Sequence, residues 1–198
     1  MASDGSSLLR KSDRTRESIL DAARIAFARK GFSGVTIRDI TDLADVNRAG
    51  FYYYFSDKTE LFIELGTETY RQVLEVAEAF GDLPIPPSRG ELAEWVEGYF
   101  SYLDRNGAFV NRSTDDMPTD PVFRAAVARS RRRTATTLGE RIVKMSPSAV
   151  DVDPAATGLV VMAMLEQSWQ MVRHNDIASM SRSTVLAAAT DLLWRALD

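Results

Sequence analysis

The chain has 198 residues, a net charge of −4 and no cysteine, which excludes disulfides and thiolate metal sites. Its hydrophobic content of 45% and charged content of 26% are ordinary for a folded protein, and no apolar run approaches the length of a membrane span. The first residues lack the apolar core of a signal peptide, so we expect a cytoplasmic protein without membrane contact. The one histidine, His174, removes most metal sites and leaves a single candidate for imidazole catalysis.

The first third of the chain predicts short helices that begin at capping residues. Residues 1–12 are rich in Ser and Gly and are expected to be disordered, and a helix follows over about 13–30, with Gly31 as its C-cap. Thr36 can cap the next helix, with Asp39 completing a capping box. Asp45 and Val46 then make a turn.

A second short helix is expected to begin at Asn47, which is a good N-cap, and to run through Phe51 and Tyr52. Asp57 caps the helix after that, with Glu60 in the capping-box position. Two short helices joined by a tight turn are the arrangement that places the second helix in the major groove of DNA.

The same stretch resembles the DNA-binding domain of the TetR family of bacterial transcriptional repressors over about residues 13–62. The positions that carry the resemblance are Gly31, Phe32, Thr36, Ile40, Ala44, Val46, Asn47, Phe51, Tyr52, Tyr54, Phe55, Lys58, Leu61 and Phe62. The chain departs from the family pattern at Thr41, at Asp45 and at Ala49–Gly50. Asp tolerates a left-handed turn, but Ala49 and Gly50 offer no side-chain hydrogen bond to a base.

Three consecutive tyrosines cannot all face one core, because successive helical residues point about 100° apart. Phe51 and Phe55 are expected in the core, and at least one tyrosine is expected on the surface. The resemblance implies that Tyr52 contacts DNA from the recognition helix and that Tyr53 and Tyr54 reach the backbone. The candidate DNA-binding residues are Thr36, Asn47, Arg48, Ala49, Gly50, Tyr52, Tyr53, Tyr54 and Lys58.

Two of these candidates have more than one interpretation. Arg48 lies near the start of the recognition helix, where an arginine either holds guanine bidentately or contacts a phosphate. Lys58 lies at a helix N-terminus, where a phosphate is favoured, and its alternative is a surface ion pair. Residues 1–58 carry ten Lys and Arg against eight acidic residues, and the rest carries fourteen against twenty, so only the first part is net positive.

The remainder of the chain also predicts helices. A long helix runs to about Phe80, the Pro-rich segment 81–90 breaks it, and a further helix ends at Asn106 and Gly107. After a short element near Phe109, helices are expected over about 121–145, 154–174 and 182–197. The sequence therefore predicts an all-α fold of about nine helices. It has a disordered tail (1–12), a helix-turn-helix DNA-binding domain (13–58) and an effector-binding and dimerisation domain (59–198).

The helix over about 154–174 contains GLVVMAML (158–165), eight residues without a charge. A helix that is apolar all round is buried on two sides, so this helix and the one over about 182–197 predict a homodimer interface. The alternative is an internal helix of a monomer. The arginines at 129 and 131–133 are expected on a solvated face, with a second nucleic-acid patch as the alternative.

Large apolar residues in the second domain suggest a pocket for a small apolar effector, with ordinary core packing as the alternative. The candidates are Trp95, Tyr99, Tyr102, Phe109, Phe123, Met162, Glu166 and Trp169. Glu166, Gln167 and Asn106 are its candidate polar groups.

These features favour a homodimeric repressor that an effector releases from a palindromic operator. We expect no catalytic residues, no metal and no cofactor, because the sequence lacks a phosphate loop, a metal-ligand cluster and a dinucleotide fingerprint. The alternatives are a small helical enzyme and a protein-binding adaptor that does not bind DNA.

Overall fold

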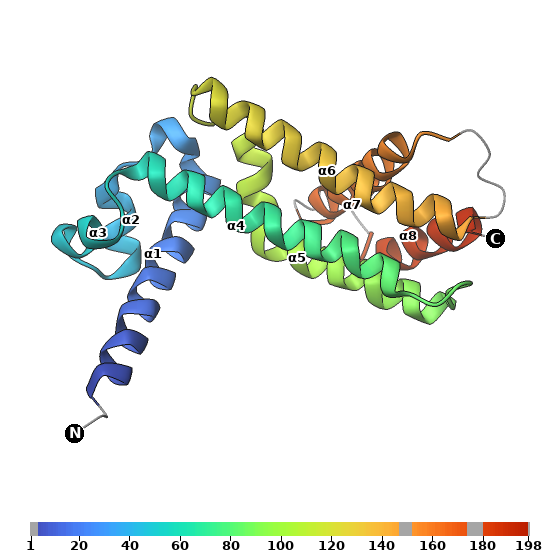
Figure 1. The fold of residues 1–198 in the computed structure, drawn as a ribbon, viewed down its shortest axis with the longest axis horizontal. Coiled ribbons are helices and arrows are strands. Elements are labelled where there is room, and N and C mark those ends of the chain that lie inside the picture. The colour runs from blue at the N-terminus through green and yellow to red at the C-terminus, as the bar shows by residue number, and fades with distance from the viewer. Residues whose placement is uncertain (1–3, 147–151, 174–179, 198) are drawn as a thin grey trace. The chain divides into compact units, whose positions relative to one another are not determined.

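The structure, a computed structural model, describes residues 4–146, 152–173 and 180–197, and every regular element in those ranges is a helix (Figure 1). The fold class is therefore all-α, as predicted. The elements are α1 (Asp4–Gly34), α2 (Ile37–Ala44), α3 (Arg48–Tyr54), α4 (Lys58–Ala79), the 3-10 helix η1 (Phe80–Asp82), α5 (Arg89–Asp115), α6 (Pro121–Met145), α7 (Pro154–Arg173) and α8 (Arg182–Leu197). Among the described helices, none combines the length and the apolar character that a membrane crossing needs.

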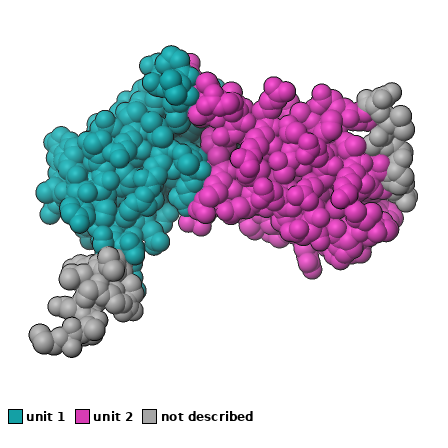
Figure 2. Space-filling view, viewed as in Figure 1, with its two compact units in different colours: residues 1–68, 108–123 teal, residues 69–107, 124–198 magenta. Residues whose placement is uncertain are grey.

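The chain forms two compact units (Figure 2). Unit 1 comprises residues 1–68 and 108–123, and unit 2 comprises residues 69–107 and 124–198. The predicted DNA-binding segment 13–58 thus lies in a unit that also includes the start of α4 and the end of α5. The functional boundary expected at residue 58 stays a prediction.

The core of unit 1 is built from aromatic and aliphatic residues that the short helices supply. Phe27 and Phe62 pack edge to face with ring centres 5.0 Å apart, and Phe109 lies 5.2 Å from Phe62. Phe51 and Phe55 are fully buried in the same core, as expected. On α2, Ile40 and Ala44 are buried while Leu43 is exposed.

The first helix is longer than expected, since α1 begins at Asp4 within the segment predicted to be disordered. Gly31 breaks its helical geometry with φ 73° and ψ 171°, a left-handed φ that glycine adopts without steric cost. A further turn reaches Gly34. The regular helix therefore ends at Gly31, as predicted, and the residues up to Gly34 follow across a kink.

The predicted helix end at Asn106 and Gly107 is wrong, because α5 continues to Asp115. Tertiary packing explains the glycine, since a Cβ at residue 107 would lie 2.6 Å from the ring of Trp169. Asn106 is fully buried and donates to the side-chain oxygen of Gln72 and to the backbone oxygen of Tyr102. The short element expected near Phe109 is thus part of α5, and the described residues contain eight α-helices where about nine helices were expected.

The core of unit 2 joins the buried faces of several helices. Tyr99, Phe100 and Leu165 are among its buried members, and Trp95 lies against Phe80 with ring centres 4.8 Å apart. The bounds of α6, α7 and α8 agree with the predicted ranges within a residue. Pro121 and Pro154 occupy the first position of α6 and α7, where a proline loses no helical hydrogen bond.

Candidate DNA-binding surface and ligand site

The helix-turn-helix of unit 1 is fixed by side-chain caps that the sequence predicts. The Thr36 hydroxyl accepts from the Asp39 amide, and the Asp39 carboxylate accepts from the Thr36 amide, which completes the capping box. Asp45 adopts the left-handed conformation at the end of α2, with φ 53° and ψ 45°. The Asn47 side chain then accepts from the Gly50 amide at 2.7 Å and caps α3. The turn between α2 and α3 is therefore held at both ends.

The outer face of α3 is exposed and polar or aromatic. Arg48, Ala49, Tyr52 and Tyr53 are exposed on α3, and Asn47 is exposed at its cap. Tyr53 is 79% exposed and Tyr52 is 45% exposed, which confirms the expectation that at least one tyrosine faces solvent. Because Phe51 is fully buried on the opposite side, α3 is anchored by one aromatic residue and presents the others.

The third tyrosine of the block has a different environment. Tyr54 is half-buried against the core of unit 1, and its hydroxyl lies 3.1 Å from the Ser12 hydroxyl. Its ring packs edge to face on Tyr53, with centres 4.9 Å apart. Tyr54 therefore connects α3 to α1 and leaves a smaller part of its surface for DNA than Tyr53 does.

The N-terminus of α2 is occupied by a carboxylate. Asp39 accepts hydrogen bonds from Lys30 and from both the amide and the hydroxyl of Thr36, and the bond from Lys30 contributes most to holding the pKa of Asp39 well below its usual range. Thr36 is thus already engaged within the protein, so a phosphate at this position would compete with Asp39.

Lys58 begins α4 and bonds backbone near the end of α1. Its Nζ donates to the carbonyl oxygens of Phe32 at 2.8 Å and Val35 at 2.9 Å, and it lies 4.7 Å from the centre of the Phe32 ring. Asp57 caps α4 by accepting from the amides of Thr59 and Glu60, as predicted. Lys58 therefore joins two segments of unit 1 in addition to placing a positive charge at a helix N-terminus.

The predicted effector-site residues fall into two groups. Phe109 and Phe123 belong to unit 1, where both rings contact Phe62. The other six candidates are in unit 2: Trp95, Tyr99, Tyr102, Met162, Glu166 and Trp169. The structure therefore does not bring all eight residues together.

Within unit 2, Glu166 lies at the centre of a polar cluster. One carboxylate oxygen accepts from the Tyr99 hydroxyl and the other from Arg131, both at 3.4 Å. Burial raises the pKa of Glu166, while Arg131 and Tyr99 act in the opposite direction. The pKa values of Tyr70, Tyr99 and Tyr102 are also raised, in each case mainly by burial.

Sequence reasoning missed Arg131 and Tyr70 as members of this cluster. Arg131 stands in a run of arginines expected to face solvent, and Arg129, Arg132 and Arg133 are indeed exposed. Arg131 is partly buried because it lies four residues before the buried Ala135, on the same face of α6. The four-residue spacing between Arg131 and Ala135 is the sequence feature that could have indicated the partial burial of Arg131.

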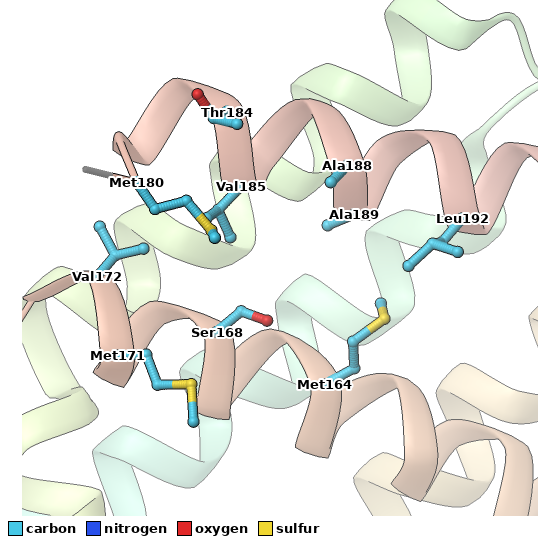
Figure 3. A pocket seen from close by; sticks show the side chains of 10 residues that line it. All are labelled: Met164, Ser168, Met171, Val172, Met180, Thr184, Val185, Ala188, Ala189 and Leu192. Carbon is cyan, nitrogen blue, oxygen red and sulfur yellow. The ribbon is translucent and has the colours of Figure 1, made fainter. Parts of the chain in front are cut away.

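A groove of about 220 Å³ lies between α7 and α8, and none of the predicted effector residues lines it (Figure 3). Its walls are apolar and rich in methionine, with Met164 and Met171 on α7 and Leu192 on α8. Met171, Met180 and Leu192 are exposed in part, so the groove opens at the surface. The exposed face of α7 continues past the groove to Leu159 and Val160.

Among the residues that the structure describes, no group of His, Asp and Glu side chains is arranged to hold a metal ion. His174, the candidate for imidazole catalysis, lies outside the described residues.

Unit 1 contains a capped helix-turn-helix whose second helix presents its outer face, which defines the class of helix-turn-helix proteins. Residues 19–65 match the family of bacterial regulatory proteins called the tetR family. The helix-turn-helix of this chain therefore belongs to the TetR family.

Curated relatives match over part of their length. The transcriptional repressor NicS of Pseudomonas putida is 31% identical over 137 residues, which is 69% of this chain and 62% of NicS. The repressor AcnR of Corynebacterium glutamicum is 30% identical over 117 residues, 58% of this chain and 57% of AcnR. The chain thus spans about three fifths of the length of these curated relatives.

Solved structures share the fold over nearly the whole chain. The TetR-family regulator PfmR from Thermus thermophilus has a TM-score of 0.68 at 22% identity, over 91% of this chain and 98% of PfmR. FadR from Bacillus subtilis, in complex with stearoyl-CoA, has a TM-score of 0.64 at 17% identity, over 91% of this chain and 96% of FadR. At these identities the likeness concerns the fold alone.

Proposed function

We propose that the protein is a transcriptional repressor that binds operator DNA through the outer face of α3. The observation that carries this proposal is the capped helix-turn-helix, in which Arg48, Tyr52 and Tyr53 stand exposed together while Phe51 anchors the helix. A guanidinium suits guanine or phosphate, and a tyrosine offers a hydroxyl to phosphate and a ring to a thymine methyl group. Operator binding places the protein in the cytoplasm.

The contacts within this surface divide into two kinds. Arg48 and Tyr52 are the candidates for reading bases, because they lie in the first turns of α3. Tyr53, Tyr54, Thr36 and Lys58 are the candidates for phosphate contacts. Asn47, Ala49 and Gly50 shape the start of α3, and the small side chains at 49 and 50 let the helix backbone approach the groove closely.

The repressor acts as a homodimer through α7 and α8. Support comes from the open apolar face that includes Leu159, Val160 and Leu192 and continues into the groove between the two helices. A second copy placed across a two-fold axis would cover this face, and its side chains would fill the groove. A two-fold dimer also presents two copies of α3 to a palindromic operator.

An effector that binds unit 2 would release the operator. A ligand can shift the DNA-binding equilibrium only by the difference between its affinities for the bound and free states, and operator DNA must weaken ligand binding by the same factor. The buried polar cluster around Glu166 supports an effector site in unit 2. Burying a carboxylate costs free energy, and core packing alone does not require one.

The test is a mobility-shift assay with DNA fragments recovered from the source genome by the purified full chain. We expect a retarded band whose intensity falls with unlabelled specific DNA and persists with random competitor. Equal competition by random DNA would contradict operator recognition. A helical enzyme or a protein-binding adaptor that does not bind DNA would give no retarded band.

A further inference from the structure

Five side chains from four helices meet in one polar cluster inside unit 2. They are Tyr70 of α4, Tyr99 and Tyr102 of α5, Arg131 of α6 and Glu166 of α7. Each tyrosine is within electrostatic reach of both Glu166 and Arg131. The rings of Tyr99 and Tyr102 are 6.0 Å apart at 72°.

The carboxylate of Glu166 makes fewer hydrogen bonds in this cluster than it can accept. A carboxylate can accept about four hydrogen bonds, and among the described residues Glu166 accepts only from Tyr99 and Arg131, each at 3.4 Å. Both distances exceed the usual range of 2.7–3.2 Å for protein hydrogen bonds. The Glu166 side chain is only 17% exposed, so water does not replace the missing bonds in full.

Arg131 compensates the charge of Glu166 incompletely. Its side chain is 42% exposed and makes a single long contact, so the guanidinium keeps much of its hydration. Burial raises the pKa of Glu166, and the opposing effects of Arg131 and Tyr99 are smaller.

Two further polar atoms in the interior of unit 2 lack a partner among the described residues. Asn106 Oδ1 is buried and accepts no hydrogen bond, while the Nδ2 atom of the same side chain donates to the Tyr102 backbone. Thr69 Oγ1 is likewise buried and unbonded, one residue before Tyr70. Like the carboxylate of Glu166, both oxygens can accept hydrogen bonds. These two atoms thus leave further hydrogen-bonding capacity unused in unit 2.

We propose that this cluster is the recognition site for a protonated amine with an alkyl or aryl body, whose ammonium group displaces Arg131 from Glu166. A tyrosine ring can offer its negative face to a cation, and a carboxylate among aromatic residues is an arrangement that suits an ammonium ion. This inference rests on the proposed function, because it names the chemical class of the effector. An anionic ligand would instead lie beside the Glu166 carboxylate and be repelled by it.

The experiment compares probes of matched size that differ in charge. Decylammonium, decanol and decanoate form one set, and 2-phenylethylammonium and 3-phenylpropanoate form a second. Binding to the full chain with Trp194→Phe is measured by the fluorescence of Trp95 and Trp169 and by calorimetry. We expect each ammonium to bind at least about tenfold more tightly than its neutral or anionic counterpart, as a charged hydrogen bond in a partly buried site allows.

Two variants of the cluster have opposite expected effects. Glu166→Gln keeps the shape of the side chain and should weaken ammonium binding by about 10- to 100-fold. Arg131→Gln removes the competing cation and should strengthen it. The matched controls are Glu94→Gln and Arg132→Gln, which change exposed residues of the same unit and should leave affinity unchanged. Circular dichroism confirms that each variant is folded.

The opposite pattern would overturn the proposal. Tighter binding of the carboxylates, with loss on Arg131→Gln, would make the cluster an anion site. Equal binding of all probes, no binding of either ammonium, or unchanged ammonium affinity in Glu166→Gln would also overturn it. Operator binding is measured separately on the same samples. Specific DNA binding together with any of these results would contradict the amine proposal and leave the proposed repressor function intact. Ammonium binding without DNA binding would support the amine site and contradict the proposed repressor function.

Discussion

The guanidinium of Arg48 donates a hydrogen bond of 3.2 Å to the hydroxyl of Tyr52, and its central carbon lies 5.6 Å from the centre of the Tyr52 ring. The two residues are one helical turn apart on the exposed face of α3. Because the hydroxyl and the ring both hold the guanidinium, the two side chains present one ordered surface. Less side-chain entropy is then lost when the helix enters a groove.

Changing Arg48 to Ala should relax base preference at one position in each half-site. The loss expected for a bidentate guanine contact is about 1–3 kcal/mol on the preferred sequence and little on random DNA. Fluorescence anisotropy against a set of single-base operator variants measures this. A uniform loss on every sequence would assign Arg48 to the phosphate backbone instead.

Replacing Tyr52 by Ala should reduce DNA affinity strongly without lowering the melting temperature of the free protein. Tyr52 is exposed, whereas the neighbouring Phe51 is fully buried, so Phe51→Ala serves as the contrasting variant and should cost about 3–5 kcal/mol of stability. Thermal denaturation followed by circular dichroism gives the comparison. Unfolding of the Tyr52 variant would show that its ring is part of the core.

Lys58→Ala should have two separable effects. The loss of the bonds to the Phe32 and Val35 carbonyls should destabilise unit 1 by about 1–3 kcal/mol. If Lys58 also contacts phosphate, the slope of log affinity against log salt should fall by about one unit. Lys144→Ala, an exposed lysine of unit 2, is the control for both. A stability loss with an unchanged salt slope would leave Lys58 with the structural role alone.

The sequence predicted those parts of the fold and site that depend on local chemistry. Thr36, Asn47 and Asp57 cap their helices as expected, since each cap needs only residues within the next turn. The first residues of α6 and α7 follow from prolines in the same way. The exposure of at least one tyrosine could be expected, because helical geometry alone prevents three adjacent tyrosines from sharing one core, and Tyr52 and Tyr53 are exposed.

The sequence could not predict features that depend on contacts between distant residues. In the sequence, Gly107 predicts the end of a helix, but α5 continues through it. The reason is the ring of Trp169, which packs so closely against residue 107 that only a glycine fits there. Likewise, a run of arginines does not reveal that Arg131 alone meets the Glu166 carboxylate. The eight candidate effector residues were chosen for size, and size does not distinguish the core of one unit from that of the other.

The apolar face of α7 and α8 predicts that the chain is a dimer with twice the mass of 22.0 kDa. Val160→Glu or Leu192→Glu should give monomers, because each places a charge on the exposed part of that face. Val122→Glu changes an equally apolar exposed residue of α6 and should leave the dimer intact. Light scattering at micromolar concentration measures the mass. A native chain that is monomeric there would exclude the dimer and the palindromic operator with it.

Glu166→Gln should stabilise the protein at neutral pH. Burial raises the pKa of Glu166, so its protonated form is favoured on folding. The cost of the charged form therefore grows as the pH rises above the unfolded pKa and is complete once the pH exceeds the folded pKa. The neutral glutamine avoids that cost, with a gain on the order of 1 kcal/mol. The gain should disappear as the pH falls below the unfolded pKa of glutamate, where both proteins are neutral at this position. Thermal melts from pH 4 to pH 8 test this, and a gain independent of pH would point to a packing effect.

The most direct test of the account is an anisotropy titration of the full chain against a labelled DNA fragment selected from the source genome, with a scrambled fragment of equal length in parallel. We predict that the selected fragment binds at least about a thousandfold more tightly than the scrambled one at physiological salt, and that Tyr52→Ala removes most of this difference. Equal affinity for the two fragments, or a preference that Tyr52→Ala and Arg48→Ala both leave intact, would contradict the claim that the outer face of α3 reads an operator.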